Sequence, residues 1–349
     1  MAGRGLVLVT GGSGYIAGFC IAQLLNEGWD VRTTVRSLAR EAEVRTSLAR
    51  VTNDGEHLGF VAADLGADAG WREAARDCDF ILHVASPLPS SNPKDDEELV
   101  GPARDGALRV LRAARDERVK RVVMTASTAA ISYGHGSYDT PATEADWSDE
   151  TNRNDTSAYE RSKTIAERAA WNWLAKEGGD LELVTICPGA VVGPVLGRDF
   201  SASIDIVKKM LDGSLPGLPR FGWPLVDVRD IADLHLRAMT APAAAGQRYI
   251  GAGPFFWMSD IADVLRQGLP VRGLGEVAKR IPKRAFPNWL VRLSANFDPV
   301  IKDRLFELDK HRPVSDGKAV SELHWIPRTT EEAILDTAVS LVAEGIVKG

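Results

Sequence analysis

The chain has 349 residues, a formal net charge of −6 and an ordinary share of apolar and charged side chains. Because both signs of charge are interspersed, nothing indicates nucleic acid or an anionic membrane as a partner. No apolar run reaches the roughly 18 residues that span a bilayer. Cys20, Cys78 and Cys187 lie far apart in apolar contexts, which is typical of buried thiols in a reducing compartment. We therefore expect a cytoplasmic protein with no metal site.

A strand, a tight turn and a helix are predicted at the start of the chain. The apolar run Leu6–Val9 is typical of a buried parallel strand, and Gly11, Gly12 and Gly14 follow it directly. Apolar residues then recur at helical spacing. A glycine turn at a helix N-terminus offers free N–H groups to a phosphate, so we interpret the turn as a dinucleotide site. A purely structural glycine turn is the alternative.

The second strand bears on the choice of cofactor. Asp30–Val35 alternates polar and apolar residues, Arg36 stands at its end, and Arg40 follows one helical turn later. An acid at this position would bind the adenosine ribose, whereas an arginine accommodates the 2′-phosphate of NADP. We predict NADP(H), with two solvated surface arginines as the alternative.

Strands and helices continue to alternate along the first half of the chain. Further strands are expected over 58–62, 80–84, 119–125 and 181–187, with helices near 71–76, 95–118 and 157–176. This order predicts an α/β fold, a Rossmann-type doubly wound parallel sheet that binds ligands at the carboxyl ends of its strands. Residues 1–187 are assigned to the NADP-binding domain, to which 226–251 return. Residues 188–225 and 252–349 are expected to form mainly a smaller C-terminal substrate-binding lobe. Within that lobe, Ser259 is expected to cap a helix, and Thr329 to open the last one.

Three polar residues form a candidate catalytic group. Ser127 lies just beyond the fifth expected strand, and Tyr159 and Lys163 are four apart on one helix, so they share a face. An ammonium beside a phenol favours the phenolate, which predicts a lowered pKa for Tyr159. A solvated helix face is the alternative for the Tyr-Lys pair. The glycine turn, Arg36 and Ser127 in this order argue against a chance match.

These motifs carry a family resemblance that extends from Leu6 to about Trp325. Thr10-Gly11-x-x-Gly14, Ser127 and Tyr159-x-x-x-Lys163 resemble the motifs of the extended short-chain dehydrogenase/reductase family. Val84-Ala85-Ser86-Pro87, Ser157-Ala158-Tyr159 and Ile186-x-Pro188-Gly189 are similar to its branch of dihydroflavonol, cinnamoyl-CoA and yeast methylglyoxal reductases. Gly14-Tyr15-Ile16-Ala17 looks closest to the microbial aldehyde and ketone reductases of that branch.

The resemblance implies an NADP-dependent oxidoreductase that reduces aldehydes or ketones to alcohols (EC 1.1.1). Tyr159 would donate the proton, Ser127 would polarise the carbonyl, and Lys163 would hold the nicotinamide ribose. The expected cofactor-binding residues are Thr10, Gly11, Gly12, Ser13, Gly14, Tyr15, Ile16, Arg36, Arg40, Asp64, Leu65, Val84, Ala85, Ser86, Tyr159, Lys163, Pro188, Gly189 and Val191.

The substrate is expected to be a small carbonyl or alcohol compound of apolar or aromatic character. This expectation depends on the candidate substrate residues Ser86, Pro87, Leu88, Tyr133, Phe221 and Trp223. A flavonoid, cinnamoyl-CoA or steroid reductase remains an alternative, as does a nucleotide-sugar epimerase or a non-catalytic NADP sensor. A dehydratase is disfavoured because Ala126, Thr128 and Ala129 supply no carboxylate. The sequence leaves a monomer and a homodimer equally open.

Overall fold

A seven-stranded sheet organises the part of the chain that carries the motifs. The computed structural model describes residues 4–87, 96–197 and 200–349. The strand order is β3-β2-β1-β4-β5-β6-β9, and all neighbours are parallel. The strands are β1 (Leu6–Val9), β2 (Asp30–Val35), β3 (Leu58–Ala62), β4 (Phe80–His83), β5 (Arg121–Thr125), β6 (Glu182–Pro188) and β9 (Arg248–Gly251). The predicted Rossmann-type α/β fold is confirmed.

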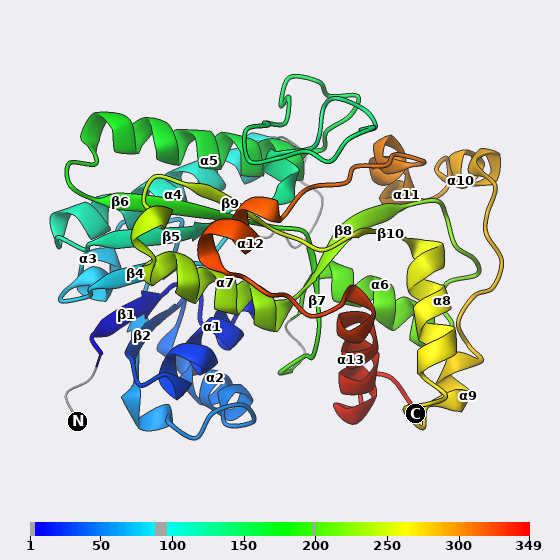
Figure 1. Cartoon of the computed structure of the whole chain (residues 1–349), viewed down its shortest axis with the longest axis horizontal. Coiled ribbons are helices and arrows are strands. Elements are labelled where there is room, and N and C mark those ends of the chain that lie inside the picture. The colour runs from blue at the N-terminus through cyan, green and yellow to red at the C-terminus, as the bar shows by residue number, and fades with distance from the viewer. Residues whose placement is uncertain (1–3, 88–95, 198–199) are drawn as a thin grey trace.

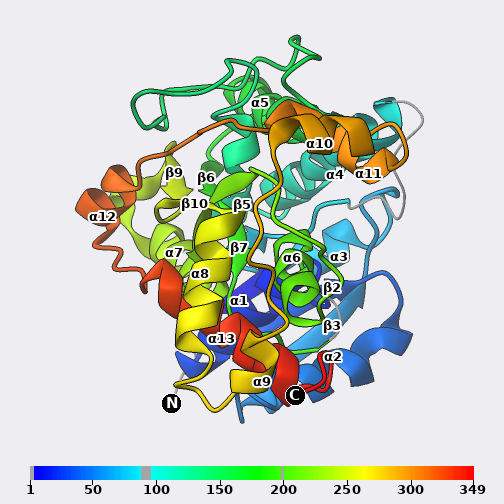
Figure 2. The ribbon, with the colours of Figure 1, turned by 90° about the vertical axis from the view of Figure 1, so that its right-hand side faces the viewer.

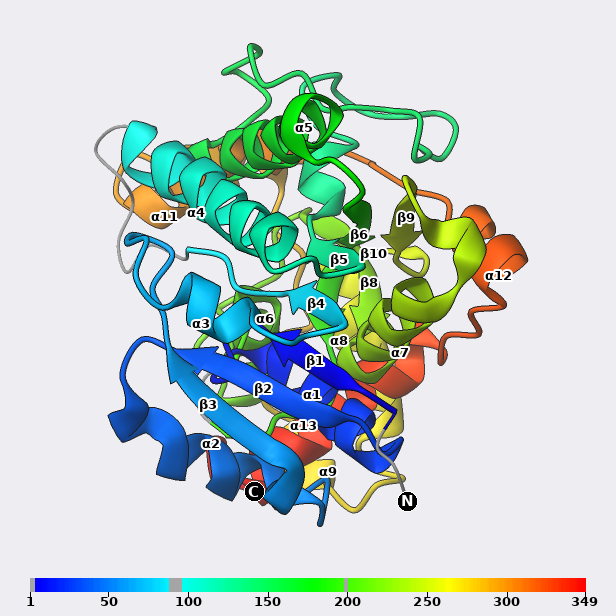
Figure 3. The same ribbon diagram turned by 90° about the vertical axis from the view of Figure 1, so that its left-hand side faces the viewer.

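Helices cover both faces of this sheet (Figures 1 and 3). Val7 and Val9 point into the core beneath one set of helices, and Leu8 points into the core on the other face. This alternation explains why an unbroken apolar run is needed in β1. The first face carries α1 (Tyr15–Asn26), α2 (Glu41–Leu48) and α7 (Val228–Thr240), and the second carries α3 (Trp71–Ala75), α4 (Glu97–Asp116) and α5 (Ala158–Glu177).

A smaller three-stranded sheet stands at the carboxyl side of the main one (Figure 2). Its order is β10-β8-β7, from β7 (Ala190–Val192), β8 (Gly222–Asp227) and β10 (Phe255–Trp257). It shares a hydrophobic core with α6 (Ala202–Leu211), α8 (Met258–Gly268) and α13 (Thr330–Ala343). The remaining helices are α9 (Gly275–Ala278), α10 (Asn288–Ser294), α11 (Pro299–Arg304) and α12 (Gly317–Leu323).

The chain crosses between the two sheets more than once. Val226 and Asp227 belong to β8 of the small sheet, so the return to the main sheet starts with α7. Trp325 is fully buried and packs in the core of the main sheet together with α12. The division of the chain into two domains at the expected residues stays a prediction.

The sequence predicts helix caps at Thr329 and Ser259, and the prediction for Ser259 is wrong. Thr329 is the N-cap of α13, where its hydroxyl accepts from the Glu332 N–H at 3.3 Å. Ser259, however, lies inside the first turn of α8, whose N-cap is Trp257. Trp257 is the last residue of β10 and is held extended by its pairing with Gly222 of β8, so the helix begins where the strand ends. Strand pairing overrides the local capping preference here.

The described residues also bear on the cysteines, on metal binding and on the membrane. All three cysteines are buried and unbonded to one another. Within ranges 4–87, 96–197 and 200–349, no cluster of His, Cys, Asp or Glu is suited to hold a metal ion. Over the same ranges, no helix combines the length and apolarity needed to traverse a bilayer.

Candidate active site

The glycine turn places unpaired backbone N–H groups at the start of α1. Gly11 has φ +73°, and the Gly14 N–H donates to the Gly11 carbonyl at 2.8 Å. A Cβ on Gly12 would lie 2.2 Å from Oγ1 of Thr33, so the turn packs directly on β2. Gly14 is the N-cap and makes no side-chain capping bond. The first N–H groups of α1 are therefore available to an anion.

Thr10 ties the end of β1 to the end of β4. Its Oγ1 accepts from the Ala85 N–H at 3.0 Å and lies 2.9 Å from Nδ1 of His83. Burial, aided by the nearby Lys163 charge, lowers the pKa of His83 to about 3. The ring is therefore neutral, and it is held to the Thr10 hydroxyl through Nδ1. The strand order reverses between β1 and β4, and dinucleotides bind at such a point in α/β sheets. The contacts of Thr10 therefore hold the two strand ends together where we expect the cofactor to bind.

The two arginines expected at the adenosine end lie beside the glycine turn. Arg36 is exposed directly after β2. Arg40 donates to Oγ of Ser13 at 2.8 Å and forms an ion pair with Glu43 at 3.1 Å. The turn and Glu43 also line one surface hollow. Arg40 therefore places a positive charge next to Ser13, and the ion pair with Glu43 partly neutralises that charge.

The other expected cofactor residues follow the carboxyl ends of successive strands. Asp64 follows β3 and accepts from the Gly66 N–H at 2.7 Å. A Cβ on Gly189 would lie 2.4 Å from the Pro224 carbonyl oxygen, so only glycine fits between the two sheets there. After β3 comes also Leu65, and after β4 come Val84, Ala85 and Ser86. The first turn of α1 contains Tyr15 and Ile16, the end of β6 is Pro188, and β7 contains Val191.

The structure brings together the side chains of the candidate catalytic group. Ser127 caps a short 3₁₀ helix, Thr128–Ala130, where its hydroxyl accepts from the Ala129 N–H at 3.1 Å, and the same hydroxyl lies close enough to the phenol of Tyr159 to influence its pKa. Nζ of Lys163 lies 5.6 Å from the centroid of the Tyr159 ring and donates to Oγ of Ser86 at 3.0 Å. These side chains reach one place from β4, β5 and α5, as the sequence predicts.

The protonation of this group differs from the expectation. The pKa of Tyr159 is raised, because burial and the neighbouring Glu160 carboxylate outweigh the lowering effect of the Ser127 hydroxyl. Burial also lowers the pKa of Lys163 to about 8. The prediction of a lowered Tyr159 pKa is wrong for the protein without cofactor. The helical spacing gives the Tyr-Lys proximity but does not show how deeply both groups are buried.

Two of the candidate substrate residues adjoin a buried carboxylate that sequence reasoning missed. The Trp223 indole N–H donates to Oε2 of Glu307 at 2.6 Å, and the charge of Glu307 contributes to the raised pKa of buried Tyr133. The Phe221 ring lies 6.4 Å from the Trp223 ring. Ser86 and Pro87 are half-buried after β4, whereas Leu88 lies outside the described residues.

Arg304 joins this carboxylate to the helix that carries Tyr159. Its guanidinium lies 2.7 Å from Glu307 and 3.8 Å from Glu160, and both carboxylates are almost fully buried. Glu160 also accepts from the Ser157 N–H at 2.8 Å, which completes a capping box at the start of α5. The Ser157-x-x-Glu160 spacing could have revealed this cap. Nothing local in the sequence marks Arg304 or Glu307.

The fold and the glycine turn define an α/β protein of the dinucleotide-binding class. The chain matches the NAD dependent epimerase/dehydratase family over residues 7–251, and it belongs to that family. The expected resemblance to the extended short-chain dehydrogenases/reductases is thereby confirmed.

Relatives and solved structures extend over most of the chain. Cinnamoyl-CoA reductase 1 of Arabidopsis thaliana is 36% identical over 267 residues, covering 76% of this chain and 75% of the relative. Tetraketide alpha-pyrone reductase 1 of the same plant is 33% identical over 305 residues, covering 84% and 88%. The yeast methylglyoxal/isovaleraldehyde reductase, solved in complex with NADPH, has a TM-score of 0.78 at 25% identity and covers 98% of this chain and 100% of its own.

Proposed function

We propose that this chain is an NADPH-dependent reductase that converts aldehydes or ketones to alcohols (EC 1.1.1) in the cytoplasm. The observation that carries the proposal is the meeting of Ser127, Tyr159 and Lys163 beside the glycine turn. The relatives named above are reductases, and the yeast neighbour binds NADPH, which supports the same activity.

The residues around the glycine turn fit a dinucleotide. A Cβ on Gly11 would come within 3.0 Å of Cβ of Ala85, so the chain approaches itself closely there and leaves the α1 N–H groups to a pyrophosphate. Arg36 and Arg40 supply positive charge for a 2′-phosphate. When bound, NADPH supplies the hydride that reduces the carbonyl carbon. The remaining proposed contacts are those at the strand ends described above.

The catalytic side chains then act on the carbonyl oxygen. The raised pKa of Tyr159 keeps its phenol protonated at neutral pH, as a proton donor requires. The Ser127 hydroxyl donates to the same oxygen and polarises it. After the proton leaves Tyr159, the Lys163 ammonium stabilises the phenolate, and its present bond to Ser86 leaves two further N–H groups for ribose hydroxyls. General-acid help of this kind contributes about 10²- to 10⁴-fold in rate.

The proposed substrate is a small apolar or aromatic carbonyl compound. Tyr133, Phe221 and Trp223 supply aromatic surface, and Ser86 and Pro87 form a half-buried segment after β4. Such a wall favours a ring or an aliphatic chain over a polyhydroxylated sugar.

The test is a substrate panel assayed by the loss of nicotinamide absorbance. Aliphatic aldehydes, diketones, aryl ketones and a flavonoid ketone are each offered with NADPH and, separately, with NADH. We expect turnover of at least one class with NADPH preferred. Tight NADPH binding without reduction of any of these carbonyls would refute the catalytic proposal and favour the sensor alternative.

A further inference from the structure

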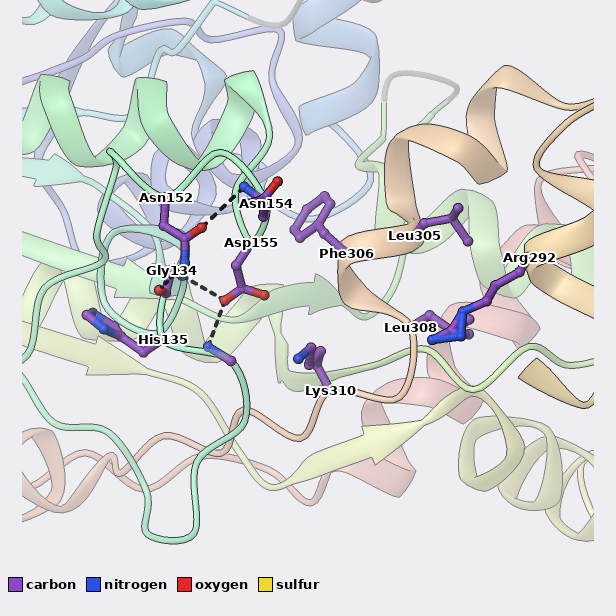
Figure 4. Close-up of a pocket in the computed structure, with 11 residues that line it drawn as sticks. Gly134, His135, Asn152, Asn154, Asp155, Arg292, Leu305, Phe306, Leu308 and Lys310 are labelled. Atoms are coloured by element: carbon purple, nitrogen blue, oxygen red, sulfur yellow. Dashed lines mark hydrogen bonds between the residues drawn. The ribbon is translucent and has the colours of Figure 1, made fainter. Parts of the chain in front are cut away.

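A cavity of about 550 Å³ lies outside the site described above (Figure 4). One wall comes from the loop segments 134–136 and 152–155, and the other from α10 and residues 305–310. None of the proposed catalytic or cofactor-binding residues lines it. A volume of this size accommodates a small organic molecule.

The cavity has an apolar side. Leu305, Phe306 and Leu308 line it from one short stretch of the chain. The Phe306 ring also packs edge-on against the ring of Tyr133 at 6.3 Å, so this apolar side backs onto the proposed substrate wall. An aromatic or aliphatic group is the natural occupant of such a surface.

The same cavity is positively charged. Lys310 is half-buried between its two walls, and Arg292 is exposed at its edge (Figure 4). Across the part of the chain that the structure describes, no hydrogen bond or ion pair engages the side chain of either residue. Their charges are therefore available to a ligand.

The one acid of the lining does not cancel these charges. Oδ1 of Asp155 pairs with Arg312 at 2.5 Å, and its Oδ2 accepts from the N–H groups of Gly134 and Gly136 at 3.0 and 2.8 Å. The Asp155 carboxylate is thus neutralised by a buried arginine and occupied by backbone donors. The cations of the cavity face a ligand without a competing carboxylate.

We propose that this cavity binds an amphipathic organic anion, with an apolar group on Leu305, Phe306 and Leu308 and a carboxylate or phosphate between Lys310 and Arg292. Guanidinium and ammonium groups bind both kinds of anion. The side-chain amide of Asn154, on the loop wall, adds a hydrogen-bond donor.

The test is isothermal titration calorimetry on the full chain saturated with NADP⁺, which occupies the dinucleotide site. The probes are 1-naphthyl phosphate and 1-naphthoate, with uncharged 1-naphthalenemethanol as the ligand control. We expect one anion to bind per chain, the better of the two probes at least about tenfold more tightly than the alcohol. The comparison of the two probes tells phosphate from carboxylate.

Variants assign the binding to the cavity. The Lys310→Met/Arg292→Met double variant should weaken anion binding about tenfold or more. Lys302→Met removes an exposed lysine of α11 outside the lining and should change the affinity less than twofold. Circular dichroism checks that each variant is folded. Absence of binding at millimolar probe, or equal affinity in the wild type and the double variant, would overturn the proposal. Because no turnover is measured, the result does not depend on the reductase activity.

Discussion

The buried ion pair between Glu167 and Arg248 allows a quantitative prediction for the helix that carries Tyr159. The Glu167 side chain has no exposed surface, and Arg248 contacts it twice, at 2.8 and 3.0 Å. Arg248 also donates to the carbonyls of Glu144 and Asp146 and stacks 3.7 Å from the centroid of the Trp147 ring. It therefore joins α5, β9 and the loop before α5.

Arg248→Met removes the only cation that the structure places against this carboxylate, among the residues described. Oε1 of Glu167 keeps the Thr185 hydroxyl at 2.7 Å, which offsets a small part of the loss. Stranding a buried charge costs about 3–5 kcal/mol. We expect Arg248→Met to lower the free energy of unfolding by about that amount. The double variant Glu167→Gln/Arg248→Met also removes the stranded charge, so its loss should be smaller by at least about 1 kcal/mol.

The assay is urea unfolding followed by far-ultraviolet circular dichroism, with linear extrapolation to water. Lys209→Met is the matched control, because it breaks a half-exposed pair with Asp205 in α6 and should cost less than about 1 kcal/mol. If Arg248→Met costs no more than Lys209→Met, or if the double variant is less stable than Arg248→Met, the reasoning about the buried charge is wrong.

Three further predictions concern the cofactor site. Gly12→Ala forces a Cβ against the buried Thr33 and should lower the free energy of unfolding, measured in urea, by about 1–3 kcal/mol. Gly55→Ala is the control and should cost less, because the space around Gly55 is open. Equal costs of the two substitutions would show that the contact with Thr33 is not tight. Arg36→Asp should shift the ratio of kcat/KM for NADPH over NADH toward NADH by about 10- to 100-fold, the value of one charged hydrogen bond, and an unchanged ratio would count against Arg36. Lys163 should titrate near pH 8 in the cofactor-free protein when its methylated amine is followed by NMR, with Lys163→Arg for assignment. The amine of Lys163 binds its proton more tightly in the unfolded chain than in the folded one. Burial of Lys163 therefore destabilises the folded protein by its full amount below about pH 8, and this destabilisation disappears as the pH rises to the ordinary lysine pKa. A midpoint at the ordinary value would contradict the burial.

Local patterns predicted those parts of the molecule that local chemistry determines. The apolar run, the glycine turn and the following helix occur as expected, because a strand buried on both faces and a turn with φ +73° at Gly11 leave few alternatives. The helical spacing of Tyr159 and Lys163 likewise ensured that they share a face.

Contacts between distant segments could not be predicted in this way. Trp223 meets Glu307, and Glu167 meets Arg248, only after the two sheets and their helices have packed. The pKa of Tyr159 depends on that same burial, so a rule based on its nearest charged neighbour gave the wrong direction. The start of α8 was also misplaced, because the pairing of β10 with β8 overrides the preference of Ser259 for a cap.

In the proposed reaction, Tyr159 donates the proton during an NADPH-dependent carbonyl reduction. The most direct measurement compares kcat for Tyr159→Phe with that of the wild type, using NADPH and the best carbonyl of the panel. Tyr138→Phe, which alters a tyrosine of the loop before α5, is the control, and NADPH affinity is measured alongside. We expect Tyr159→Phe to lower kcat by about 10²-fold or more with NADPH affinity changed little, and Tyr138→Phe to leave kcat unchanged. A Tyr159→Phe enzyme with wild-type kcat would show that Tyr159 is not the proton donor.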